Sequence, residues 1–224
     1  MKVVLAVPGD SFTEKFLQGW TSTIVELANK GHQIVGVVNG VSSFVTFARM
    51  KTLGLDVGRG VNQKPFDGKL DYDAWITLDS DIVFSPDNII DLINSLERHP
   101  VVAGYYMMSD MTHFAVVKKW DPKYFKEYNN FQFMTKADMD AEQEVFIPVA
   151  YAGMGIFGCR RHVLESLTYP YFDAPLQKFT KEDGTILKDI CSEDVAFCKN
   201  IQSAGFDVML NTKLRVGHEK KIVI

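Results

Sequence analysis

Two carboxylates one residue apart follow a short hydrophobic run. Asp79-Ser80-Asp81 comes directly after residues 74–78, Ala-Trp-Ile-Thr-Leu, a composition typical of a buried strand. A carboxylate pair can hold a hard divalent cation, and Mg²⁺ or Mn²⁺ would keep positions free for water or phosphate oxygens. Asp-x-Asp triplets are common, and these acids could also simply begin a solvated turn. Their position after a buried strand favours the metal site.

A second acidic pair opens a predicted helix over residues 192–204. Ser192 can cap this helix, and Glu193 and Asp194 fall in its first turn. The helix dipole favours acids at this position, so a purely structural explanation is available. The functional alternative is that one of the two carboxylates lies in a cleft and acts as a general base.

Three further features add candidates with weaker signals. His218, near the end of the sequence, could complete a metal site through one ring nitrogen, although a lone histidine is more often a surface or packed residue. Gly153-Met154-Gly155 would let the backbone approach a ligand closely, or would mark a tight turn. Arg49, on a predicted helix over residues 43–53, could neutralise a phosphate or simply be exposed.

The first hundred residues carry Arg49, Asp79 and Asp81, and they alternate between strands and helices. That order predicts a Rossmann-like, mostly parallel α/β sheet with helices on both faces. Ligands bind such sheets beyond the carboxyl ends of the strands, so we expect Pro8, Asn39, Asp79 and Asp81 at one edge. The predicted strands are 2–7, 33–38, 74–78 and 101–106, and the predicted helices are 13–30, 43–53 and one that starts at Ser85-Pro86.

The second half is less regular. Residues 107–144 are rich in aromatic side chains without a sustained period, and residues 56–69 are expected to form a loop. We expect one domain over residues 1–224, with a change of composition near residue 107 and no linker there. The elements predicted in the second half are strands 145–150, 156–158 and 206–210, helices 161–167 and 192–204, and a hairpin 178–188 around Asp183-Gly184.

Composition excludes several classes of protein. The 224 residues carry 24 Lys and Arg against 28 Asp and Glu, so a basic face for nucleic acid is not expected. The three cysteines form no Cys-x-x-Cys pair, which favours a reducing compartment and a cytoplasmic location. The apolar run at residues 3–7 ends too early for a signal peptide, and no segment reads as a membrane span.

Together these motifs resemble the GT-A glycosyltransferases, which use nucleotide sugars, and in particular small family-2-like and phage-encoded members. The resemblance covers most of the chain, and the order and spacing of the motifs make it more specific than any single one. In the first half it rests on the end of the opening strand, Val7-Pro8, and on the Asp-x-Asp segment Asp79 to Phe84, which is followed by a helix start with proline. In the second half it rests on the glycine-containing strand Ala152 to Phe157, followed by Arg160 to Val163, on the acid-containing helix Ser192 to Gly205, and on Gly217-His218.

The resemblance implies a single GT-A catalytic domain, with a nucleotide-binding half (1–106) and an acceptor-binding and catalytic half (107–224). It also implies the metal-dependent transfer of a hexose from a nucleotide sugar, a UDP-sugar such as UDP-glucose, to a saccharide or another hydroxyl acceptor. It implies that Asp79, Asp81 and His218 hold Mn²⁺ or Mg²⁺, which would stabilise the charge of the departing diphosphate. Asp194 would deprotonate the acceptor in an inverting reaction, and Glu193 would orient it. The candidate donor contacts are Pro8, Asp10, Asn39, Arg49, Asp79, Ser80, Gly153 and Gly155.

Two other functions fit parts of the sequence. Residues 76–83 match the motif of haloacid-dehalogenase phosphatases, in which Asp79 would be the nucleophile. That motif normally lies on the first strand of its domain, whereas two strand–helix units precede it here, and no second Gly-Asp-rich acid motif follows. The other alternative is a binding module for nucleotide sugars without turnover, against which the joint presence of Asp79, Asp81, Asp194 and His218 argues.

Overall fold

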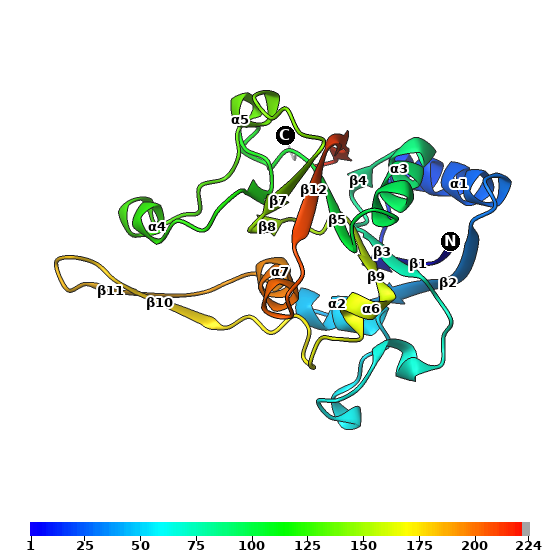
Figure 1. Ribbon diagram of the computed structural model, residues 1–224, viewed down its shortest axis with the longest axis horizontal. Helices are drawn as coiled ribbons and strands as arrows, with labels where there is room; N and C mark the ends of the chain where they lie inside the picture. The colour runs from blue at the N-terminus through cyan, green and yellow to red at the C-terminus, as the bar shows by residue number, and fades with distance from the viewer. Residues whose placement is uncertain (221–224) are drawn as a thin grey trace.

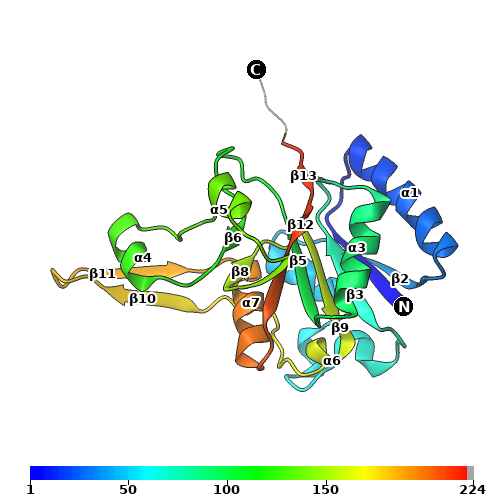
Figure 2. The same cartoon turned by 45° about the horizontal axis from the view of Figure 1, so that its top comes forward.

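A seven-stranded sheet runs through the middle of the molecule (Figures 1 and 2). The computed structural model describes residues 1–220. The strand order is β2-β1-β3-β9-β5-β12-β7. These strands are β1 (Lys2–Pro8), β2 (Gln33–Gly40), β3 (Ala74–Leu78), β5 (Val101–Tyr105), β7 (Phe146–Val149), β9 (Ile156–Arg160) and β12 (Val208–Arg215).

Most strands of the sheet point the same way. β1 pairs in parallel with β2 and β3, and β12 pairs in parallel with β5. β9 runs antiparallel between β3 and β5, and β7 runs antiparallel to β12 at the edge. This topology confirms the mostly parallel sheet predicted from the alternation of strands and helices.

Helices cover both faces of the sheet, as predicted. α1 (Glu14–Asn29) and α3 (Pro86–Leu96) lie on one face, while α2 (Val45–Thr52), α6 (Arg161–Leu164) and α7 (Glu193–Ser203) lie on the other (Figure 1). Successive side chains of a strand point to opposite faces, so β1 contributes to two separate cores. Val3, Leu5 and Val7 belong to the core under α1 and α3, and Val4 and Ala6 to the core under α2 and α7.

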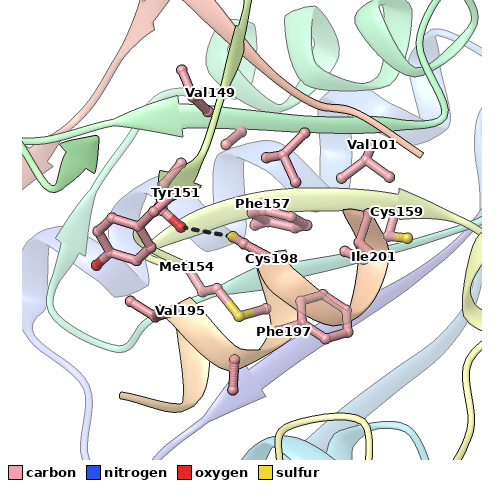
Figure 3. Packing of buried hydrophobic residues seen from close by; sticks show 14 of the residues in the cluster. Val101, Val149, Tyr151, Met154, Phe157, Cys159, Val195, Phe197, Cys198 and Ile201 are labelled. Carbon is pink, nitrogen blue, oxygen red and sulfur yellow. Dashed lines mark hydrogen bonds between the residues drawn. The ribbon is translucent and has the colours of Figure 1, made fainter. Parts of the chain in front are cut away.

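The core beneath α7 anchors the start of that helix. Figure 3 shows α7 packed against β9, with Phe197 and Cys198 close to Phe157. The rings of Phe157 and Phe197 have centroids 5.8 Å apart, and Phe172 stacks on Phe197 at 4.4 Å. Because these side chains are fully buried, the first turn of α7, which carries the acidic pair, is held at a defined place.

The second half contains more structure than its sequence pattern predicts. Asp121 caps α4 (Pro122–Tyr128) and Pro122 occupies its first position, so a start signal was present although no apolar period followed. The predicted loop 56–69 contains the 3₁₀ turns η1 (Val57–Arg59) and η2 (Pro65–Gly68). The remaining elements are β4 (Ile82–Val83), β6 (Val116–Val117), α5 (Lys136–Asp140), β8 (Tyr151–Ala152), the hairpin β10 (Leu176–Thr180) and β11 (Ile186–Ile190), and β13 (Gly217–His218).

Several predicted boundaries differ from the structure: the strand expected at 156–158 continues to Arg160, and the helix expected at 161–167 ends at Leu164. The largest difference concerns the last long strand of the sheet. The strand expected at residues 206–210 begins at Val208 and continues to Arg215. The polar residues Asn211 to Lys213 hid this extension. β12 pairs with β7 as far as Asn211, and its pairing with β5 is irregular between Leu210 and Arg215. No helix within residues 1–220 combines the length and apolar character that crossing a membrane requires.

Candidate active site

The carboxyl ends of β1, β2 and β3 meet at one edge of the sheet, where they surround a cavity of about 390 Å³. The Asn39 side chain donates to the Gly9 carbonyl oxygen at 2.8 Å and ties the end of β2 to the end of β1. Asn39 therefore supports the rim of the cavity. Of the residues predicted for donor or metal binding, those that line the cavity are Pro8, Asp10, Arg49, Asp79, Ser80 and Asp81.

Arg49 joins the two acidic motifs. Its Nη1 and Nη2 atoms donate to the two oxygens of Asp79 at 3.0 and 3.1 Å, and its Nε donates to Glu193 Oε1 at 3.0 Å. The Arg49 side chain is only 5% exposed. Burial alone would lower the pKa of the guanidinium, but the charges of Asp79 and Glu193 outweigh it and raise this pKa. Arg49 is thus a buried, bidentate clamp rather than an exposed helix residue.

Asp81 faces the C-terminal part of the described chain. β13 pairs with β4, which places His218 Nε2 3.1 Å from Asp81 Oδ2, and Lys220 Nζ lies 2.8 Å from the same oxygen. Burial alone would raise the pKa of Asp81, but the hydrogen bonds from His218 and Lys220 outweigh it and lower this pKa to about 2. Asp81 is therefore held as a carboxylate.

The pairing of Asp81 with His218 suits a divalent cation. Ligand atoms at neighbouring positions of an octahedral ion with bonds near 2.1 Å lie about 3.0 Å apart, and the observed separation is 3.1 Å. His218 Nδ1 lies 3.1 Å from the Met107 carbonyl, which can only accept, so Nδ1 carries a proton and Nε2 faces Asp81. Mg²⁺ commonly takes few protein ligands and completes its shell with water and substrate phosphates.

Asp79 stands apart from this pair. Both of its oxygens accept hydrogen bonds from Arg49, and no group of three His, Cys, Asp or Glu side chains among residues 1–220 is arranged to hold an ion. A direct role of Asp79 as a metal ligand stays a prediction, and its pairing with Arg49 does not favour it.

Asp194 lies in a network of its own. Tyr151, on β8, donates its hydroxyl to Asp194 Oδ2 at 2.9 Å, and the Ser192 hydroxyl and the Val195 backbone N–H contact Oδ1. Burial, followed by the nearby charge of Asp194, raises the pKa of Tyr151 well above its usual value. Tyr151 therefore remains a protonated donor that orients the Asp194 carboxylate. Sequence reasoning missed Tyr151, because nothing local distinguishes it from a core tyrosine.

Gly153 and Gly155 make room for an aromatic ring. A Cβ at Gly153 would lie 2.3 Å from the Tyr106 hydroxyl oxygen, and one at Gly155 would lie 2.5 Å from Tyr106 Cε1. Tyr106 in turn meets the His218 ring edge-on at 4.8 Å between centroids. The two glycines thus have a packing role beneath His218, and their contact with a donor stays a prediction.

Comparison with known proteins gives matches only among solved structures. No family model and no curated protein matches the sequence. The crystal structure of A197 from STIV aligns with 100% of this chain and 97% of its own, with a TM-score of 0.51 and 16% identity. The chain shares its fold with A197. At this identity the similarity concerns the fold alone.

Nucleotide-sugar glycosyltransferases are also among the structural neighbours. GalNAc-T7 in complex with UDP, GalNAc and Mn²⁺ aligns with 99% of this chain at a TM-score of 0.49 and 9% identity, and this chain spans only 43% of it. Glucosyl-3-phosphoglycerate synthase from Mycobacterium tuberculosis, in complex with Mn²⁺, UDP and phosphoglyceric acid, aligns with 99% of this chain and 72% of its own, at a TM-score of 0.46 and 13% identity.

Proposed function

We propose that this protein is a metal-dependent glycosyltransferase that moves a hexose from a nucleotide sugar, a UDP-hexose, to a hydroxyl acceptor with inversion. The observation that carries the proposal is the double engagement of Arg49. It binds Asp79, two residues from the candidate metal ligand Asp81, and Glu193, which adjoins the candidate base Asp194. One buried side chain therefore ties together the two segments that carry the candidate metal ligand and the candidate base.

The donor would occupy the cavity at the ends of β1, β2 and β3. Asp81 and His218 would hold Mn²⁺ or Mg²⁺, and the bound ion would act as a Lewis acid that stabilises the charge of the leaving diphosphate. Lys220 adds a positive charge beside Asp81. The residues proposed to contact the donor or to shape its cavity are Pro8, Asp10, Asn39, Arg49, Asp79 and Ser80.

Asp194 would take the proton of the acceptor hydroxyl. Each carboxylate oxygen can accept two hydrogen bonds, and in the described part of the chain Oδ2 accepts one, from Tyr151. The second acceptor position on Oδ2 can receive the acceptor hydroxyl while Tyr151 keeps the carboxylate in place. Glu193, paired with Arg49, would hold the first turn of α7 against the donor side.

The proposal is tested by nucleotide release from UDP-, GDP-, ADP- and dTDP-sugars with Mn²⁺, with Mg²⁺ and with chelator. We expect release from one donor that requires metal and is lost in Asp81→Ala. With that donor and an acceptor, Asp194→Asn should bind the donor but fail to transfer the sugar. Asp207→Asn, which changes an exposed acid outside the site, is the matched control. Normal metal-dependent release by Asp81→Ala would refute the metal assignment, and normal transfer by Asp194→Asn would place the base elsewhere.

Each of the two alternatives makes a prediction of its own. A phosphatase needs Asp79 as a free nucleophile, whereas both Asp79 oxygens are bound by Arg49. If the protein hydrolysed an aryl phosphate and became phosphorylated on Asp79 during the reaction, it would nevertheless be a phosphatase. A binding module would bind the nucleotide sugar and release no product with any acceptor.

A further inference from the structure

A second cavity, of about 600 Å³, shares no lining residue with the donor cavity. It lies between the segment that follows β6 and the helix α5. Its volume falls in the range of small-molecule sites, which combine aromatic walls with a few polar groups. Its wall includes Lys118, Trp120, Gln132, Phe133, Asp138 and Glu142.

Two contacts connect this cavity to Asp194. Phe133, on the cavity wall, meets the ring of Tyr151 edge-on at 6.3 Å, and the Tyr151 hydroxyl donates to Asp194. Lys199, on the same helix as Asp194, places its Nζ 5.2 Å from the centroid of the Trp120 ring. A molecule in this cavity would therefore be connected to the base through Phe133 and Tyr151, and through Trp120 and α7.

The charges of the cavity do not favour an anion. Lys118 is paired with Glu142, and Asp138 accepts the backbone N–H and the hydroxyl of Thr135 at 2.8 and 2.7 Å. The wall carries three acids against two lysines. A phosphorylated ligand would meet a slightly negative surface, whereas a neutral ligand with hydroxyl groups would not be repelled.

Aromatic rings and hydrogen-bonding side chains are combined here in the way that a sugar ring requires. The C–H face of a pyranose packs on an aromatic face, and its hydroxyl groups need amide or carboxylate partners. Trp120 and Phe133 provide the rings, and Gln132 carries an exposed amide. We propose that this cavity binds a neutral sugar unit of the acceptor, so that the acceptor is a saccharide; the acceptor role rests on the function proposed above.

The test measures sugar binding without any donor, so that it does not depend on transfer. Methyl glycosides of glucose, galactose, mannose and N-acetylglucosamine, with glucose 6-phosphate as the anionic comparison, are titrated calorimetrically into the full-length protein. We expect at least one neutral glycoside to bind with a millimolar dissociation constant. Trp120→Ala and Gln132→Ala should each weaken that binding by about tenfold or more, and Trp120→Phe should largely preserve it.

Tyr128→Ala, which removes an exposed ring of α4 that does not line the cavity, is the control. Donor hydrolysis by the wild type and by Tyr128→Ala is measured alongside binding, so that the donor site and the sugar site are assessed separately. If the wild type binds a neutral glycoside but hydrolyses none of the donors, the proposed transferase is refuted and the proposed sugar site stands. Three results would each overturn the sugar site. They are equal binding by the wild type, Gln132→Ala and Trp120→Ala, a preference for glucose 6-phosphate, and no binding of any neutral glycoside up to about 50 mM.

Discussion

At the scale of single residues, Arg49 determines how the two acidic motifs lie relative to each other. Its partners Asp79 and Glu193 are mostly enclosed, with side chains 28% and 11% exposed. A buried carboxylate is tolerated when it is paired and becomes costly when its partner is removed. The position of Glu193, and through it the start of α7, therefore depends on a guanidinium that lies 144 residues away in sequence.

This dependence predicts the effect of Arg49→Met. The substitution keeps an unbranched apolar side chain but leaves two carboxylates without a cation, so we expect the free energy of unfolding to fall by about 3–5 kcal/mol. Lys30→Met, which removes the exposed pair with Glu26, should cost less than about 1 kcal/mol. Urea denaturation of both variants measures the difference. Equal costs for the two substitutions would show that Arg49 contributes no more than a surface ion pair.

At the scale of elements, the approach of α2 to the end of β2 sets the position of Arg49. Gly40 ends β2, and a Cβ there would lie 1.9 Å from the carbonyl oxygen of Ala48, the residue that precedes Arg49. A backbone oxygen cannot move aside in the way that the tip of a side chain can. Only glycine at position 40 allows the strand and the helix to come this close.

Gly40→Ala should therefore displace α2 and lower stability by about 1–3 kcal/mol or more. It should also weaken donor binding, because Arg49 and the rim of the cavity move with the helix. Gly36→Ala in the same strand is the matched control, since its Cβ would make ordinary contacts, 3.7 Å from Leu70 and Val4. Urea denaturation and nucleotide titration measure the two effects. A Gly40→Ala protein as stable as the Gly36→Ala protein would contradict the close packing.

At the scale of the whole molecule, the strand order interleaves the two halves of the sequence. β9, from the second half, lies between β3 and β5 of the first, and β12 and β7 extend the sheet beyond β5. In the complete sheet β5 pairs only with strands that follow residue 106. The first half therefore lacks the strand that joins its own sheet together, and the single domain stays a prediction.

A fragment of residues 1–106 should consequently fail to fold cooperatively. We expect no sigmoidal urea transition by circular dichroism, because β5 would lose every pairing partner and both cores would be open. Coexpression with residues 107–224 should restore a folded complex that binds nucleotide. The intact chain is the control. A cooperative transition of the isolated fragment would indicate two domains instead of one.

Local patterns in the sequence determined most of the elements and several members of the site. The apolar run before Asp79 and the Pro86 helix start are complete within a few residues, so β3 and α3 could be predicted. Asn88 accepts from the Ser85 backbone N–H at 2.9 Å, a further contact local to the start of α3. The motifs also named Asp81 and His218 as one metal site, and the structure brings the two together.

Only the tertiary structure decided how these parts are connected. The insertion of β9, the pairing of Arg49 with Glu193, the contact of Lys220 with Asp81 and the support of Asp194 by Tyr151 all join residues far apart in the chain. Hydrophobic period and capping residues reflect the conformation of a segment, but they carry no information about which other segment lies beside it. The sequence by itself thus determined most of the elements and several of the chemical groups, and chain topology decided which groups meet.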